Sequence, residues 1–407
     1  MSVIVQKYGG SSLSTPDQIQ RVAKRVAQLR QSGERPIIVV SAMGKSTDEL
    51  FRLAYLVSSR PNRRELDMLL TAGERISMAL VSMALHELGC PAISLTGSQA
   101  GIFTDSSHSN ARISELRPIR VTESLAKNQV VVIAGFQGVD PLTKEVTTLG
   151  RGGSDTSAVA LAAHFRAKRC EILKDVDGIF SADPKLVASP LHYSHFPLST
   201  LEESCYWGAK VLHFRSVELA RSMKVRLFIG SSIHLDRGTH IYEDAEGSES
   251  DNDPAGEKNM YEETKALTVT KLNEVHHLEV ACHHPDEGLA LLESILHQHQ
   301  LAWPQILASA YEEGRWRSMI SSTAEQIQAL QMAIQGTKIR FIKQALSAIT
   351  ISCKGSYTSD FSRQVTACLY QEKIIPLKSL HSRNSISVFV ENHQGDLTVQ
   401  ALHQLIK

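Results

Sequence analysis

The sequence predicts an α/β protein, with a doubly wound domain built on a parallel sheet in the first half and smaller α+β modules after it. Three observations support this prediction. Short apolar runs alternate with longer helical patterns up to about residue 240. Residues 244–263 are acidic and nearly free of large apolar side chains, and strand and helix patterns then restart at a smaller scale. Alternating strands and helices are typical of a parallel sheet covered by helices.

Four apolar runs in the first half are expected to form buried strands. They are Val3–Val5, Pro36–Val40, Val130–Ala134 and Cys170–Leu173. Residues 17–31 repeat apolar side chains at helical spacing, and Thr15 followed by Pro16 is a typical helix start. A second helix is expected over residues 74–88, with one apolar face toward the core. That face consists of Ile76, Ala79, Leu80, Met83 and Ala84.

The acidic segment 244–263 is too poor in apolar side chains to bury much surface, so we interpret it as a linker. It separates a predicted catalytic domain, residues 1–243, from two small modules in residues 264–407. Each module is expected to have a βαβ pattern. The expected strands are Ala266–Thr270, Ile339–Ile342, Ala348–Ser352 and Ile386–Val390, and the expected helices are Glu287–Gln298 and Phe361–Tyr370.

Composition and charge exclude several classes of protein. Forty-three basic residues balance 43 acidic residues, so no net field draws the chain to nucleic acid or to an anionic membrane. No apolar run approaches the roughly 20 residues that span a bilayer, and we expect a cytoplasmic protein. The cysteines form no CxxC pair and are expected to be free thiols. They are Cys90, Cys170, Cys205, Cys282, Cys353 and Cys368.

A first glycine-rich turn, Lys7–Ser12, directly follows the first strand. Glycine lets a backbone approach phosphate oxygens closely, and the lysine adds a positive charge. The turn is therefore a candidate site for a polyphosphate. A tight turn with a surface lysine would leave the same pattern, so the residues alone do not decide between the two interpretations.

A second glycine-rich turn, Gly150–Thr156, opens a predicted helix that runs to Phe165. Its Arg151 can bind a carboxylate through two hydrogen bonds, and a helix amino terminus favours anions. This is the strongest candidate for a substrate site. The alternative is an ordinary connector in which Asp155 only caps the helix.

Two other patterns are rejected. Gly44–Thr47 resembles the end of a phosphate-binding P-loop, but the motif needs a glycine five positions earlier, where Val39 stands inside a strand. Two histidine pairs, at residues 276–277 and 283–284, invite a metal hypothesis. Neighbouring residues of a strand point to opposite faces, and no further ligand stands at a recognisable spacing. We expect no metal site there.

Several ordered motifs between Val3 and about Tyr242 resemble the aspartokinase family of the amino-acid kinase fold. They are Lys7–Ser12, Ser41–Gly44 with Thr47-Asp48, Leu70–Arg75, Gly97–Gly101 with Asn110–Arg112, Gly135–Gly138, Thr147–Thr156, Asp175–Gly178 with Ala182–Pro184, and Gly208–Leu212. The resemblance implies an αβα sandwich, followed by ACT-like modules of the ferredoxin-like βαββαβ type. It also implies Mg²⁺- and ATP-dependent phosphorylation of the side-chain carboxylate of L-aspartate, the first step toward lysine, threonine and methionine.

The resemblance also implies roles for individual residues. Lys7 and Asp155 would be catalytic, with Lys7 on the ATP phosphates and Asp155 organising the reacting groups. The residues expected around the amino acid are Thr47, Glu74, Arg151, Gly152, Gly153 and Ser154. The residues expected around ATP are Lys7, Gly9, Gly10, Ser11, Ser41, Lys174, Asp175, Asp177, Phe180, Asp183, Lys185 and Lys210. Glu74 would provide the negative partner of the α-ammonium group.

The chain departs from the family pattern at three positions. Lys174 stands where a small hydroxyl residue is usual, Phe180 where tyrosine is usual, and Phe214 where proline is expected. The carboxyl-terminal modules keep the size and rhythm of ACT modules but few of their motifs. The resemblance implies a homo-oligomer formed through these modules, and it leaves the identity of any amino-acid effector open.

Two rival functions are retained. One is a kinase of the same fold that acts on glutamate, acetylglutamate or a nucleotide, against which the pairing of Glu74 with Arg151 argues. The other is a catalytically silent amino-acid sensor, against which Lys7 and Asp155 argue.

Overall fold

The computed structural model describes residues 2–234, 237–243, 264–299, 301–355 and 358–406. The predicted linker, residues 244–263, lies outside these ranges. The chain divides into two compact units. The first comprises Met1–Ile179, His192–Cys205 and Lys210–Pro254, and the second comprises Phe180–Leu191, Tyr206–Ala209 and Ala255–Lys407. Two short segments of the first half therefore group with the second unit.

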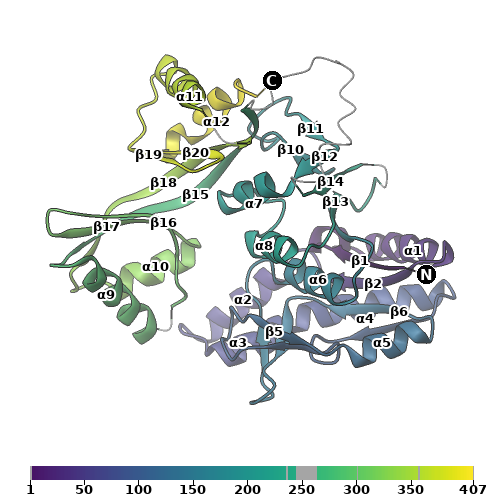
Figure 1. Ribbon diagram of the computed structural model, residues 1–407. Helices are drawn as coiled ribbons and strands as arrows, with labels where there is room; N and C mark the ends of the chain where they lie inside the picture. The colour runs from purple at the N-terminus through teal and green to yellow at the C-terminus, as the bar shows by residue number, and fades with distance from the viewer. Residues whose placement is uncertain (1, 235–236, 244–263, 300, 356–357, 407) are drawn as a thin grey trace, which may run out of the picture. The chain divides into compact units, whose positions relative to one another are not determined.

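An eight-stranded sheet forms the centre of the first unit, in the order β12-β14-β13-β9-β1-β2-β6-β3 (Figure 1). Every pair is parallel except β13 with β14. The strands are β1 (Val3–Tyr8), β2 (Arg35–Val40), β3 (Ala92–Leu95), β6 (Val130–Ala134), β9 (Cys170–Lys174), β12 (His195–Pro197), β13 (Leu227–Ser231) and β14 (Gly238–Tyr242). The four strands expected from the sequence are confirmed, and they are the four neighbours β9-β1-β2-β6.

Helices cover both faces of this sheet, which gives the predicted αβα sandwich. Apolar side chains of α1 and α4 pack on one face with Tyr8, Ile38 and Val132. Helix α6 packs against β1, β2 and β9 and against α8. The helices of this unit are α1 (Pro16–Gln31), α2 (Ser46–Val57), α3 (Arg63–Leu70), α4 (Ala72–Glu87), α5 (Ile119–Ala126), α6 (Gly153–His164) and α8 (Phe214–Ser222), with the 3₁₀ turn η1 (Gly10–Leu13). Helix α7 (Leu198–Tyr206) ends at the boundary between the units.

The first helix forms as the sequence predicts. The Thr15 hydroxyl accepts a hydrogen bond from the Gln18 N–H, and the Gln18 side chain accepts one from the Thr15 N–H. Such reciprocal capping, with Pro16 in the first turn, stabilises a helix start by about 1 kcal/mol.

The predicted apolar face of α4 is confirmed only in part: Leu80 and Ala84 pack against the core, but other members of the face do not. Ile76 is 54% exposed and Met83 is 64% exposed, whereas Val81 and Leu85 are buried. Gly73, in the first turn of this helix, lies close to Ala42: a Cβ at Gly73 would lie 2.7 Å from the Ala42 Cβ. Apolar periodicity alone cannot reveal such a close contact.

A second small sheet, β5-β4-β7-β8, completes the first unit. Its strands are β4 (Ile102–Thr104), β5 (Ile113–Leu116), β7 (Gln137–Val139) and β8 (Val146–Thr148). A separate strand pair is formed by β10 (Ile179–Phe180) and β11 (His192–Tyr193). The continuous helical stretch Arg63–Glu87 is long and apolar enough to cross a membrane by length and composition, but 44% of its most apolar window is buried. Asp67 and Glu74 within it bind loops of the first unit, so we interpret it as a core segment.

The second unit contains a six-stranded antiparallel sheet in the order β16-β17-β15-β18-β20-β19. Its strands are β15 (Lys265–Ala281), β16 (Gln305–Glu312), β17 (Arg315–Ser321), β18 (Ile339–Lys354), β19 (Lys378–His381) and β20 (Ser385–Glu391). Its helices are α9 (Pro285–Gln298), α10 (Ala324–Ala333), α11 (Ser359–Gln371) and α12 (Gly395–His403), with the 3₁₀ turn η2 (Asn392–Gln394). The predicted strands and helices of the second half are present, together with elements that the sequence analysis did not predict.

The two ACT-like modules share their central strands. The predicted strands 339–342 and 348–352 are parts of the single strand β18, and β15 continues eleven residues beyond Thr270 to Ala281. One core lies between the sheet and α9 and α10, and another lies between the sheet and α11 and α12. The first part of β15 pairs with the end of β18, so it completes the second module rather than the first.

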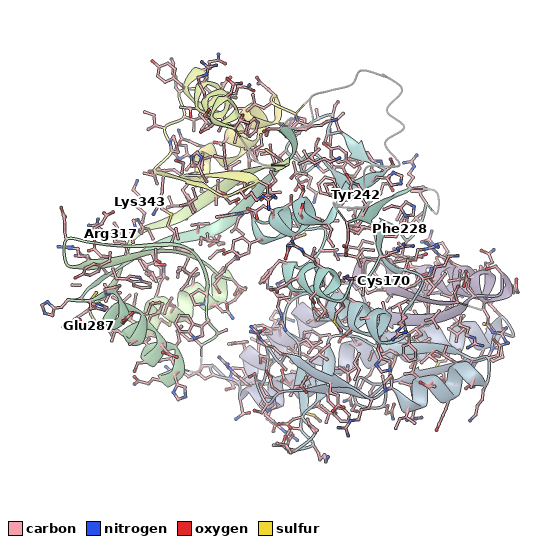
Figure 2. All side chains as sticks on the ribbon, in the orientation of Figure 1. Cys170, Phe228, Tyr242, Glu287, Arg317 and Lys343 are labelled. Carbon is pink, nitrogen blue, oxygen red and sulfur yellow. The ribbon has the colours of Figure 1, made fainter. Side chains whose placement is uncertain are left out.

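A buried carboxylate joins three strands on this sheet. Glu279 of β15 is only 3% exposed and accepts hydrogen bonds from Arg315 and Arg317 of β17 and from Arg340 of β18. Arg317 is labelled in Figure 2. Burial raises the pKa of the Glu279 carboxyl, but the hydrogen bonds from the three arginines outweigh burial and lower the pKa to about 2.

Candidate functional site

Lys7 lies near the carboxyl end of β1, the central strand of the first sheet. Tyr8 packs into the core with α1, so the alternation of a strand turns Lys7 to the opposite face, toward α6. The turn after it is held by hydrogen bonds from the Gly9 N–H to Leu173 O and from the Gly44 N–H to Gly10 O. The carboxyl ends of parallel strands are where ligands bind in such sheets.

A close backbone contact explains the second of the paired glycines after Lys7. A Cβ at Gly10 would lie 2.7 Å from the carbonyl oxygen of Ala42, which no side chain tolerates. A Cβ at Gly9 would lie 3.8 Å from the Nζ of Lys7. Gly9 therefore lies beside the ammonium group, and Ser11 follows in η1.

Asp155 stands in the first turn of α6 and forms an ion pair with Lys7. The Lys7 Nζ lies 2.6 Å from Asp155 Oδ1, and the two side chains are 7% and 5% exposed. Burial lowers the pKa of Lys7, and the positive charge of Lys174 lowers it further against the opposing effect of Asp155. Burial raises the pKa of Asp155, but Lys7 and Lys174 outweigh burial, so the pKa falls below its ordinary value. The structure thus brings the two predicted catalytic residues together.

The glycines of the second turn are required by its geometry. Gly150 and Gly152 have φ angles of 74° and 70°, in the left-handed region that favours glycine. A Cβ at Gly152 would lie 2.1 Å from the Cβ of His213. Gly153 and Ser154 begin α6 and are buried, whereas Arg151 is exposed in the turn. Arg151 is therefore free to reach a ligand.

Glu74 is buried beside the first turn, and the residue is only 3% exposed. Its Oε1 accepts a hydrogen bond of 3.1 Å from the Ala42 N–H. Among the described residues, its Oε2 has no hydrogen-bond partner. Burial raises the pKa of Glu74 to about 7, although the Ala42 N–H and Lys7 act in the opposite direction. A cationic ligand would provide the missing partner.

Two other predicted residues border this region. Ser41 directly follows β2, and its N–H donates to Tyr8 O at 3.1 Å. Thr47 lies in the first turn of α2 and is half-buried.

The remaining predicted nucleotide residues fall in three places. Lys174 ends β9, and Asp175 follows it; Asp177 pairs with Arg237 at 3.0 Å. Lys210 is exposed and stands next to Val211 in the loop before α8. The last three predicted residues are Phe180, Asp183 and Lys185. They belong to the second unit, and their part in nucleotide binding stays a prediction.

Asp67 and Arg215 support the second turn, and the sequence analysis missed both. Asp67 of α3 is fully buried and accepts hydrogen bonds from the N–H groups of Ser109 and Thr148. Arg215 of α8 donates to Leu149 O at 2.8 Å and to Ala111 O at 3.1 Å. A signal existed for Asp67, because it lies on the same helical face as the apolar residues Leu66 and Leu70.

The fold and the site define an amino-acid kinase. The sequence profile of the amino acid kinase family matches residues 2–231, so the chain belongs to this family. Several curated aspartokinases are among its relatives. The aspartokinase of Corynebacterium glutamicum is 50% identical over 241 residues, which cover 59% of this chain and 57% of that protein. The match thus spans less than two thirds of that relative's length.

Solved structures extend the similarity over nearly the whole chain. Aspartokinase III of E. coli, in complex with aspartate and ADP, matches with a TM-score of 0.79 and 20% identity, covering 99% of both chains. The aspartate kinase of Synechocystis is 32% identical, with a TM-score of 0.55, and the match covers 99% of this chain and 69% of that one. The amino-acid kinase fold followed by ACT-like modules is confirmed.

Proposed function

We propose that this protein is an aspartate kinase, which transfers the γ-phosphoryl group of ATP to the side-chain carboxylate of L-aspartate and releases ADP. The observation that carries the proposal is the buried Lys7–Asp155 ion pair, which lies at the carboxyl edge of the sheet with Glu74 near Lys7. The identity to aspartokinases across the first unit supports it. The similar structure of E. coli aspartokinase III contains aspartate and ADP, which supports aspartate and an adenine nucleotide as the ligands proposed for this protein.

In the proposed reaction, a carboxylate oxygen of aspartate attacks the γ-phosphorus, and the bond to the oxygen between the β- and γ-phosphorus breaks. The products are 4-phospho-L-aspartate and ADP. A carboxylate is ionised near neutral pH, so no general base is needed. The protein's contribution is to position the reactants and to offset negative charge, which Lys7 does on the phosphate oxygens. Asp155 holds Lys7 in place.

The residues on the amino-acid side complement the two ends of aspartate. The unpartnered oxygen of Glu74 would accept a hydrogen bond from the α-ammonium group. Arg151 would bind a carboxylate through two hydrogen bonds. Ser154 and the N–H group of Gly152 would add donors at the amino terminus of α6.

Mg²⁺ fits this site as an ion carried mainly by the nucleotide. Among the described residues, no group of three His, Cys, Asp or Glu side chains is placed to hold a metal ion. Mg²⁺ usually keeps several waters and binds through one or two carboxylates together with substrate phosphates. Asp155 would be the protein carboxylate near it, and the bound ion would neutralise charge on the β- and γ-phosphates.

The second unit is proposed to be regulatory, with residues 1–243 catalytic and residues 264–407 forming two ACT-like modules that assemble a homo-oligomer and bind an amino-acid effector. The sheet and helix order of the unit supports this assignment. A cytoplasmic location, within a pathway that leads to lysine and threonine, completes the proposal.

A substrate panel tests the proposed function. We expect ATP-dependent acyl phosphate formation, trapped as the hydroxamate, with L-aspartate and not with L-glutamate or N-acetylglutamate, and no ADP formation with a nucleoside monophosphate. Turnover of L-glutamate in place of L-aspartate would favour the rival kinase. No turnover of any substrate by a folded protein that binds ATP would favour the amino-acid sensor. Repeating the assay with lysine and threonine tests regulation.

A further inference from the structure

Lys174 occupies an unexpected position at the Lys7–Asp155 pair. Strands β1 and β9 are parallel neighbours, with Lys7 opposite Ile172. Side chains two residues apart on a strand point to the same face, so Lys174 projects to the same side of the sheet as Lys7. That side faces α6, which carries Asp155. The sheet register therefore delivers two lysines to one carboxylate.

The Lys174 ammonium makes two contacts. Its Nζ lies 3.6 Å from Asp155 Oδ2 and donates a 2.6 Å hydrogen bond to Val211 O. The side chain is 19% exposed, compared with 7% for Lys7. Lys174 thus links the catalytic carboxylate to the loop that carries Lys210, a predicted nucleotide residue.

The ammonium groups of Lys7 and Lys174 lie near the single carboxylate of Asp155, so one positive charge is left uncompensated in a largely buried site. Glu74 does not fully compensate it, because burial raises the Glu74 pKa to about 7 and a large fraction of that group is then neutral near neutral pH. Burying an unbalanced charge is unfavourable without a partner. A polyanion that binds between the two ammonium groups would provide that partner.

We propose that Lys174 is a second phosphate-binding cation of the active site, which acts with Lys7 on the terminal phosphates of the nucleoside triphosphate. This inference rests on the proposed function, and it assigns to a lysine the position where the family usually has a small hydroxyl residue. The partial exposure of Lys174 lets its ammonium leave Val211 O for a phosphate oxygen. A lysine that only tied the loop to the sheet would not need to lie beside Asp155.

The proposal predicts a specific change in pH dependence. The charged groups that face Lys7 are Asp155 from α6, Lys174 from β9 and Glu74 from α4. Burial lowers the Lys7 pKa most, Asp155 raises it, and Lys174 lowers it. Removing the positive charge of Lys174 must therefore raise the Lys7 pKa. Activity that depends on protonated Lys7 would then persist to higher pH.

The test compares Lys174→Met, Lys174→Arg and the control Lys24→Met, which alters an exposed lysine of α1. Dissociation constants for MgATP are measured without any amino acid, and folding is checked by thermal unfolding. We expect Lys174→Met to weaken MgATP binding about tenfold or more, as expected for loss of a charge-assisted hydrogen bond. Lys174→Arg should retain most of the binding, and the control should match the wild type.

Kinetics with L-aspartate provide the second readout. In Lys174→Met, the KM for ATP should rise while the KM for aspartate stays within about twofold, and the alkaline limb of the kcat/KM profile for ATP should move to higher pH. Equal MgATP affinity in the wild type and Lys174→Met, or an unmoved alkaline limb, would overturn the proposal. Binding that depends on Lys174 without aspartate turnover would contradict the proposed function alone. A wild type that does not bind MgATP would overturn both.

Discussion

At the scale of single residues, the site depends on ionisable groups whose charge is set by burial and by neighbours. The sequence predicted a site at Lys7, Asp155 and Glu74: Lys7 and Asp155 lie in glycine-rich turns, and the resemblance implies a role for all three. The sequence motifs could not identify the contact of Lys174 with Asp155, which results from the register of β9 against β1. Register between distant strands is not encoded in local spacing.

Aspartate binding should weaken as the pH falls below about 7. Burial raises the Glu74 pKa to about 7, so protonation below that pH removes the negative partner of the α-ammonium group. We expect the KM for aspartate to rise between pH 8 and pH 6 while the KM for ATP changes little. Steady-state kinetics across this range measure both.

Glu74→Gln should raise the KM for aspartate at pH 8 and remove most of its pH dependence. Glu87→Gln, at the exposed end of the same helix, provides the control. An unchanged pH dependence of the KM for aspartate in Glu74→Gln would contradict the role of this carboxylate.

At the scale of elements, apolar periodicity predicted the central strands and most helices. It did not predict the full buried face of α4 or the continuity of β18. In α4, Leu80 and Ala84 of the predicted apolar stripe pack against the core, but Ile76 and Met83 of the same stripe are exposed. Strand β18 appeared as two strands because Lys343 and Gln344 interrupt its apolar pattern. Interruptions of this kind occur where a long strand passes between two cores.

Helix α3 should control aspartate binding through Asp67. Asp67 accepts hydrogen bonds from Ser109 and Thr148, which flank the turn that carries Arg151. Asp67→Asn replaces one accepting oxygen by an NH₂ group, which leaves a buried donor unsatisfied at a cost of about 1–3 kcal/mol. We expect a lower Tm and a higher KM for aspartate, with a smaller change in the KM for ATP.

The exposed Asp17 of α1 provides the matched control, Asp17→Asn. Equal increases in both KM values for Asp67→Asn would show that the helix supports the whole site rather than the substrate turn, and would contradict this assignment.

At the scale of the whole molecule, the sequence predicted a catalytic fold followed by small modules but not the sharing of strands between those modules. The first part of β15 pairs with the end of β18, so the second module is not continuous in sequence, whereas the core of the first module comes from one continuous stretch. Local patterns cannot show which distant strands pair, because each strand can satisfy its hydrogen bonds with many partners. The segments Phe180–Leu191 and Tyr206–Ala209 group with the second unit for a similar reason: Trp207, for example, packs with Phe389.

The second unit should lose stability in acid through Glu279. The folded-state pKa of about 2 lies below the ordinary value of 4.5, so this carboxylate stabilises the fold above about pH 4.5. That contribution is lost as the pH falls from about 4.5 toward 2. Glu279→Gln should lower the Tm at pH 7 and flatten its decline in acid. Glu293→Gln, on the exposed side of α9, is the control, and identical acid profiles for Glu279→Gln and the wild type would contradict this account.

The central claim is that the Lys7–Asp155 pair carries phosphoryl transfer to L-aspartate. The most direct measurement is the rate of aspartyl hydroxamate formation by the wild type, Lys7→Met and the control Lys24→Met, with folding confirmed by thermal unfolding. The account predicts that the wild type and Lys24→Met turn over L-aspartate at similar rates, and that folded Lys7→Met loses at least about a hundredfold in kcat. Comparable turnover by Lys7→Met would contradict it.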